Sequence, residues 1–118
     1  MTFVLLIYRA TEMGKAPPGI DERATLRAHS KLQAETSARG QLHAVARLEE
    51  SRDAQTVRRV GSAHAIADGP YIETKEWLVG FYVLDCRNEA EAVERAKSIC
   101  ADDEHVIEVR RVAWRWKG

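Results

Sequence analysis

The sequence predicts an α+β fold in which one antiparallel sheet carries two helices on the same face. Short apolar runs with strand character, two stretches with helical spacing, and the order in which these segments alternate lead to this prediction. The 118 residues suffice for one domain of ordinary size, so we expect residues 1–118 to form a single domain.

The first part of the chain predicts a strand followed by a helix. The apolar run 3–8 indicates the strand, and the breaker Pro17-Pro18-Gly19 places a loop after it. Residues 21–39 contain neither Gly nor Pro and end at Gly40, the residue type expected just past a helix. At 100° per residue, His29 falls on the side of this helix that faces the sheet.

The middle of the chain predicts strands alone. Residues 42–48 alternate with a period of two, which is typical of a strand. The runs 56–60 and 63–67 are joined through Gly61-Ser62 and indicate a hairpin. The run 77–84 is apolar at every position except for its single glycine, so this strand needs cover on both faces.

The last part predicts a capped helix and a final strand. Asn88 can cap the helix, and Glu91 could return a bond to the cap. An apolar stripe then follows at helical spacing: Val93, Ala96, Ile99 and Cys100. Residues 106–113 indicate the closing strand.

This order of elements most simply gives the ferredoxin-like plan. The runs 3–8 and 77–84 are apolar on both sides, yet the chain holds no third layer to cover the second face of the sheet. If this second face were exposed to solvent, its apolar patch would exceed the roughly few hundred Å² that monomeric proteins usually expose. We therefore predict a two-fold homodimer, sheet against sheet.

Composition bears on nucleic-acid binding, membrane binding and cellular location. The 18 basic residues balance the 18 acidic ones, so no overall field attracts nucleic acid or an anionic membrane. Only two cysteines are present, and the N-terminus carries neither a basic leader nor an apolar run of membrane length. We therefore expect a cytoplasmic protein with no nucleic-acid or membrane partner.

The sequence carries no motif for a cofactor. His43, His64 and His105 are scattered without metal-ligand spacing, so we expect isolated surface histidines and no metal site. The glycines form no phosphate-binding loop, and no serine or cysteine has the setting of a covalent nucleophile. We expect no cofactor.

The densest run of turn and charged residues is 68–76, directly before the most apolar strand. Asp68 can bond to the backbone of the turn at Gly69-Pro70. Glu73 and Lys75 could hold donors and acceptors at the mouth of a cavity. A solvated loop with a weak surface ion pair is the alternative.

The segment 68–82, DGPYIETKEWLVGFY, resembles the signature of the DGPF family, which is named for its DGPFAETKE motif and is related to the YCII-related proteins. Tyr71 replaces the usual Phe, and Ile72 replaces a small residue. The segments TVR at 56–58 and EVR at 108–110 resemble further family strands, although Arg111 stands where Pro is common. The resemblance spans nearly the whole chain.

The resemblance implies a ferredoxin-like fold that pairs through its sheets into a dimeric α/β barrel. Most DGPF relatives have no established reaction, and their genes often lie beside those of alternative sigma factors. The related YCII-type proteins carry a His and Asp pair in a cleft, with the His on the first helix. His29 precedes Gly40 by eleven residues, the interval that the resemblance implies for that His.

One hypothesis is an acid/base enzyme that acts on a small organic molecule in a cleft between the first helix and the sheet, near the dimer seam. His29 would be the base and Asp68 its partner. A core histidine bonded to a backbone carbonyl is the alternative for His29. The candidate substrate-binding residues are Arg58, Glu73, Lys75 and Tyr8, of which Arg58 can equally be an exposed strand arginine and Tyr8 can fill the core or the seam.

The second hypothesis is a non-catalytic dimeric module. It would bind a small ligand or a protein such as an alternative sigma factor. A third interpretation is that the 68–76 motif only shapes the dimer. The sequence does not separate these hypotheses, and it names neither substrate nor reaction.

Overall fold

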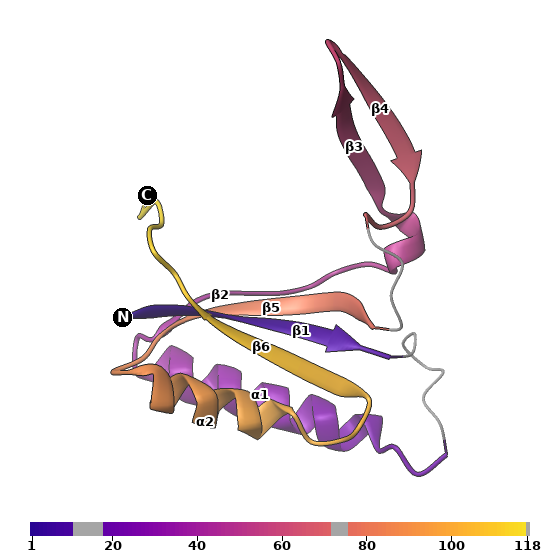
Figure 1. The fold of residues 1–118 in the computed structure, drawn as a ribbon. Helices are drawn as coiled ribbons and strands as arrows, with labels where there is room; N and C mark the ends of the chain where they lie inside the picture. Colours follow the sequence, from indigo (N-terminus) through magenta and orange to yellow (C-terminus); the bar gives the residue numbers. More distant parts are fainter. Residues whose placement is uncertain (11–17, 72–75, 118) are drawn as a thin grey trace.

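The main sheet has four strands in the order β2-β5-β1-β6, and each strand runs antiparallel to its neighbours. The computed structural model describes residues 1–10, 18–71 and 76–117. Helices α1 and α2 both lie on one face of this sheet (Figure 1). The α+β prediction is thus confirmed, and the arrangement is consistent with a ferredoxin-like fold. The elements of this body are β1 (Thr2–Arg9), α1 (Glu22–Ala38), β2 (Leu42–Arg47), β5 (Trp77–Asp85), α2 (Glu89–Ile99) and β6 (His105–Arg111).

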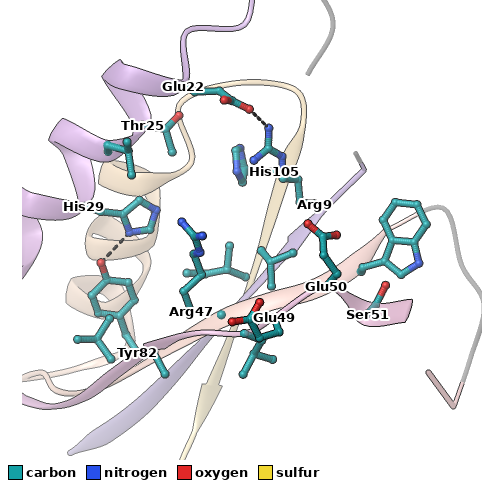
Figure 2. Close-up of a pocket in the computed structure, with 18 of the residues that line it drawn as sticks. Arg9, Glu22, Thr25, His29, Arg47, Glu49, Glu50, Ser51, Tyr82 and His105 are labelled. Carbon is teal, nitrogen blue, oxygen red and sulfur yellow. Dashed lines mark hydrogen bonds and ion pairs between the residues drawn. The ribbon is translucent and has the colours of Figure 1, made fainter. Parts of the chain in front are cut away.

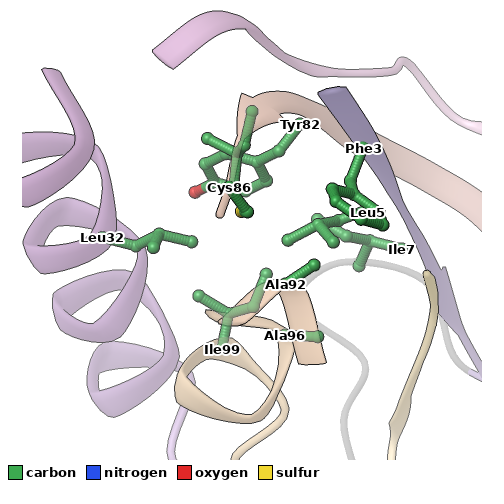
Figure 3. Packing of buried hydrophobic residues seen from close by; sticks show 10 residues of the cluster. Phe3, Leu5, Ile7, Leu32, Tyr82, Cys86, Ala92, Ala96 and Ile99 are labelled. Atoms are coloured by element: carbon green, nitrogen blue, oxygen red, sulfur yellow. The ribbon is translucent and has the colours of Figure 1, made fainter. Parts of the chain in front are cut away.

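Burial alternates along the central strand β1, as expected for a strand with one face under helices. Phe3, Leu5 and Ile7 are buried and belong to the hydrophobic core, whereas the residues between them are only half-buried. The core lies between sheet and helices (Figure 3), where these side chains meet Leu32 of α1 and Ile99 of α2. Two alanines, Ala92 and Ala96, complete the buried face of α2.

Both helices begin where the sequence indicates. Asp21 caps α1, and its Oδ1 accepts from the backbone N–H groups of Arg23 and Ala24 at 3.0 and 3.1 Å. The chain leaves α1 through Gly40, whose φ of +68° suits glycine. Within the described residues, no helix combines the length and the apolar character that a membrane crossing requires.

The bonds of Glu91 and the end of α2 differ from the prediction. Asn88 caps the helix by accepting from the backbone N–H of Glu91 at 2.9 Å. The Glu91 carboxylate, however, accepts bonds from Arg87 and Gln41. Cys100 was expected on the apolar stripe, but it is exposed and follows the last helical residue, because the helix ends at Ile99.

No helix of the described residues lies on the second face of the main sheet (Figure 1). Val4, Leu6 and Tyr8 alternate with the core residues of β1 and therefore point toward this face. Their cross-strand partners on β5 are Val83, Phe81 and Leu78. This open face is apolar across its two central strands, as the sequence predicted.

The predicted hairpin forms a separate two-stranded sheet. It consists of β3 (Gln55–Val60) and β4 (Ala63–Asp68), and the short helix η1 (Ser51–Asp53) links it to the body. Figure 1 shows that the hairpin projects away from the main sheet. Val57 and Ile66 face each other across it and are 64% and 67% exposed. The hairpin therefore contributes little to the core of the described chain.

Gly80 sets the spacing between β5 and β2. A Cβ atom placed there would lie 2.7 Å from the carbonyl oxygen of Ala46, a contact that real Cβ atoms essentially never make. We predict that Gly80→Ala lowers the free energy of unfolding by about 1–3 kcal/mol, because the strands must separate to admit the methyl group. Urea titration monitored by circular dichroism measures this change. An unchanged midpoint and slope would contradict the close approach of the two strands.

Candidate active site between helix α1 and the sheet

A cavity of about 340 Å³ opens between α1 and the helix-covered face of the sheet (Figure 2). Its walls come from the first half of α1, the end of β2 with the turn that follows, and parts of β1, β5 and β6. More than half of the lining residues carry polar or charged side chains, although most of the surface that the lining presents to the cavity is apolar. This mixture is typical of sites that bind small molecules.

His29 contacts Tyr82 inside this cavity. The Nδ1 atom of His29 lies 2.6 Å from the Tyr82 hydroxyl, and the two rings stack at 11° with centroids 5.7 Å apart. Gln33, one turn later on α1, donates its Nε2–H to the same hydroxyl at 3.2 Å. We assign the hydroxyl proton to the bond with Nδ1, because Gln33 already donates to the hydroxyl oxygen; the ring proton of neutral His29 is then on Nε2. The prediction that His29 faces the sheet is confirmed by this contact with β5.

Burial keeps both members of this pair neutral. Desolvation lowers the pKa of His29, and the nearby His105 lowers it further. Desolvation also raises the pKa of Tyr82, although the bond from Gln33 acts in the opposite direction. Near neutral pH the pair is thus an uncharged phenol that donates to an uncharged imidazole.

His105 and Asp102 form a second pair beside the cavity. His105 Nδ1 lies 2.7 Å from Asp102 Oδ1, and this oxygen also accepts from the backbone N–H of Glu104 at 2.9 Å. Burial favours the neutral acid, but the hydrogen bonds from His105 and Glu104 lower the pKa of Asp102. The Thr25 hydroxyl, 3.4 Å from Asp102 Oδ2, connects the pair to α1.

The expectation of isolated surface histidines is wrong for His105, which is only 9% exposed. It precedes Ile107 and Val109 by even intervals on β6, and both of these pack on the core. That alternation is the signal in the sequence that could have placed His105 inside. His43 is also not isolated, because its Nε2 lies 2.7 Å from Asp85 Oδ2 at the edge of the sheet.

A buried arginine closes one end of the cavity. Arg9, the last residue of β1, is 2% exposed, and its Nη2 donates to Glu22 Oε1 at 2.5 Å. Glu22 opens α1, so this ion pair ties the start of the helix to the central strand (Figure 2). Composition gave no reason to expect a charged side chain in the core.

Of the four predicted site residues that the structure describes, it brings His29 into this cavity. Asp68 and Arg58 lie on the projecting hairpin, because residues 55–68 pair with one another instead of joining the main sheet. Asp68 accepts a long bond of 3.5 Å from Gln55, and the Arg58 guanidinium lies 5.1 Å from the ring centre of Tyr71. Within one chain, the expected pairing of Asp68 with His29 is therefore not formed.

The remaining predicted residues lie elsewhere. Tyr8 belongs to the open face of the sheet, opposite the cavity. Glu73 and Lys75 fall outside the described residues. Among the residues that the structure describes, no three His, Cys, Asp or Glu side chains are grouped so that they could hold a metal ion.

Protonation of His29 should make stability depend on pH. The pKa of His29 in the folded chain lies below its ordinary value of 6.5, so the unfolded chain binds this proton first as the pH falls. The contribution of His29 is therefore fully present above about pH 6.5 and decreases as the pH falls from there toward the folded-state pKa. We predict that the free energy of unfolding decreases between about pH 7.5 and 5.5, and that His29→Gln reduces this decrease. Urea titrations at both pH values measure it.

His64→Gln serves as the control for this experiment, because His64 lies exposed on the hairpin. This variant should follow the wild-type protein. Equal pH dependence in wild type and His29→Gln would contradict the role assigned to burial of His29.

Comparison with known proteins relates the chain to the YCII-related proteins, the wider group to which the motif family is related. The model of the YCII-related domain matches residues 1–117. An uncharacterized protein of Rhizobium meliloti (strain 1021) is 32% identical over 99 residues, which cover 84% of this chain and 80% of that protein. With nearly its whole length matched, the chain belongs to the YCII-related family.

Proposed function

We propose that the protein is an acid/base catalyst that acts on a small organic molecule bound in the cavity beside α1. The observation that carries this proposal is the 2.6 Å contact between His29 Nδ1 and the Tyr82 hydroxyl, inside a cavity large enough for a ligand. A buried, neutral imidazole that accepts from a phenol is suited to receive a proton. The role is the one expected for His29, with Tyr82 in place of Asp68 as its partner.

A proton relay follows from this geometry. When a ligand releases a proton to the Tyr82 oxygen, the phenol passes its own proton to His29 Nδ1. Tyr82 is then unchanged, His29 carries one positive charge, and the ligand carries the electron pair left by its broken bond to hydrogen. Return of the proton to another ligand atom would complete an isomerisation.

A second histidine, His105 of β6, lines the same cavity. Asp102 fixes the orientation of His105 through Nδ1 and leaves Nε2 without a bond to any described residue. An imidazole oriented in this way can donate to, or accept from, a polar atom of the ligand. His29 and His105 are then two imidazole groups that line one cavity.

The proposal includes a homodimer that packs open face against open face. Its support is the apolar surface around Leu6 and Phe81, together with exposed Leu78 and Val106 on the same face, which are 37% and 45% exposed. Pairing of this kind would produce the dimeric α/β barrel implied by the resemblance. Roles for Asp68 and Arg58 stay predictions.

Membership of the DGPF branch, a cytoplasmic location and a link to an alternative sigma factor also stay expectations from the sequence. The non-catalytic alternative remains a distinct outcome. It predicts saturable binding in the cavity without any turnover of the bound molecule.

Proton transfer can be tested without knowing the natural substrate. We predict that the wild-type protein, in deuterated buffer, accelerates loss of C–H proton signals from at least one enolisable compound among phenylpyruvate, acetoacetate and cyclohexanone. His29→Gln and Tyr82→Phe should each reduce this rate by about 10²-fold or more, the usual contribution of a positioned acid or base. Proton NMR measures the exchange.

His64→Gln again provides the matched control and should keep the wild-type rate. Undiminished exchange in both His29→Gln and Tyr82→Phe would contradict the assigned relay. Exchange no faster than in buffer alone, for all three compounds, would favour the non-catalytic alternative.

The dimer has its own test. We predict that Leu6→Lys converts a dimer into a folded monomer, because the added charge would be buried between two sheets. Within one chain the new lysine would face Glu108 across β1 and β6, which favours folding of the monomer. Sedimentation velocity at micromolar concentration measures the change. Val57→Lys, at an exposed apolar position on the hairpin, is the control, and a wild-type monomer would contradict the proposal.

A further inference from the structure

We propose that the ligand of this cavity is a small organic monocarboxylate whose carboxylate binds Arg47 and whose apolar body lies against the cavity wall. The inference rests on the proposed use of the cavity as a substrate site and adds the chemical class of the substrate. Arg47 takes the place of Arg58, which the sequence predicted as a substrate-binding arginine.

Arg47 is the positively charged lining residue that has no partner among the described residues. It ends β2, and Figure 2 shows its side chain projecting from the strand into the space beside His29. Its guanidinium makes no hydrogen bond or ion pair within 4.0 Å to any described residue. By contrast, the other arginine in the lining, Arg9, is held by Glu22.

The backbone leaves room for a ligand against Arg47. Its cross-strand partner is Gly80, so no side chain stands opposite Arg47 on β5. A methyl group at this position would collide with the carbonyl of Ala46, and Gly80 is itself part of the cavity lining. A planar guanidinium with free donors recognises a carboxylate through two parallel hydrogen bonds.

The charges in the lining discriminate against a ligand with two negative charges. Arg9 and Glu22 compensate each other, while Glu49 and Glu50 line the same cavity as Arg47. Two arginines and three glutamates therefore give the lining a net negative charge, with His29 neutral near pH 7. A dianion such as a phosphate monoester would be repelled by Glu49 and Glu50 more strongly than a monocarboxylate, whose single charge can pair directly with Arg47.

The rest of the lining predicts an apolar body for the ligand. Leu26 of α1, Val45 of β2 and Val79 of β5 line the cavity, and Trp77 adds an aromatic ring. A volume of about 340 Å³ is sufficient for a molecule with one or two rings. The carboxylate on Arg47 would then orient this body toward the Tyr82 hydroxyl.

Equilibrium binding tests this class of ligand directly. The probes are phenylacetate, its neutral analogue phenylacetamide, acetate without the apolar body, and phenyl phosphate, which is a dianion near pH 8. We predict that the wild-type protein binds phenylacetate at least about tenfold more tightly than each of the other three, as a charge-assisted bidentate contact implies. NMR titration at pH 8 gives the dissociation constants.

Variants at position 47 test whether Arg47 causes the preference for phenylacetate over phenylacetamide. Arg47→Gln should bind phenylacetate and phenylacetamide equally, and Arg47→Lys should recover part of the preference because the charge remains. Arg59→Gln, which removes an exposed strand arginine of the hairpin, should match the wild type. Circular dichroism and urea midpoints verify that each variant is folded.

Several results would overturn the inference. These are equal binding of phenylacetate and phenylacetamide by the wild type, tighter binding of phenyl phosphate, an undiminished preference in Arg47→Gln, or no saturable binding of any probe. Failure of the proposed catalysis is a separate result. If no compound exchanges protons but phenylacetate binds through Arg47, the protein is a carboxylate-binding module and the catalytic proposal alone is wrong.

Discussion

Packing of α1 against the central strands is the interaction on which the candidate site depends. Leu32 and Thr36 are almost fully buried in the second half of α1, and Thr36 satisfies its hydroxyl within the helix by donating to the carbonyl of Leu32 at 2.7 Å. One turn earlier, His29 meets Tyr82 instead of an aliphatic side chain, and the cavity opens there. The same packed helix therefore closes the core at one end and holds a polar wall of the cavity at the other.

The sequence predicted most of the fold because local signals and burial agree in this chain. Asp21 and Gly40 lie at the two ends of α1. Asp21 accepts a hydrogen bond from a backbone N–H of the first turn, and Gly40 adopts the positive φ that ends the helix. The period of two in β1 is visible as alternating burial, and the hairpin at 55–68 follows from two short runs around a Gly61 turn. Each feature requires only residues close together in the chain, so no knowledge of tertiary contacts was needed.

The site was harder to predict because its members meet across long stretches of sequence. Tyr82 lies within the apolar run 77–84, and 53 positions separate it from His29, so no local pattern links the two side chains. Arg47 and Gly80 face each other only because β2 and β5 pair in one particular register. The resemblance drew attention to Asp68, but it gave no information on whether 55–68 would join the main sheet or form a hairpin of its own.

The two faces of one sheet explain how a small chain can accommodate both a cavity and a partner. Along β1, Ile7 and Arg9 contribute to the cavity, whereas Tyr8 between them belongs to the open face. The Tyr82 and His29 pair stays neutral because Tyr82 is buried and His29 is partly buried. Packing of the helices on the sheet provides this burial within a single chain. Dimerisation through the open face would then stabilise the strands that carry Tyr82 and Arg47 without occupying the space where the ligand binds. The proposed catalysis and the proposed association are thus separable by mutation, since a change at a half-buried position of the open face leaves every residue of the cavity lining in place.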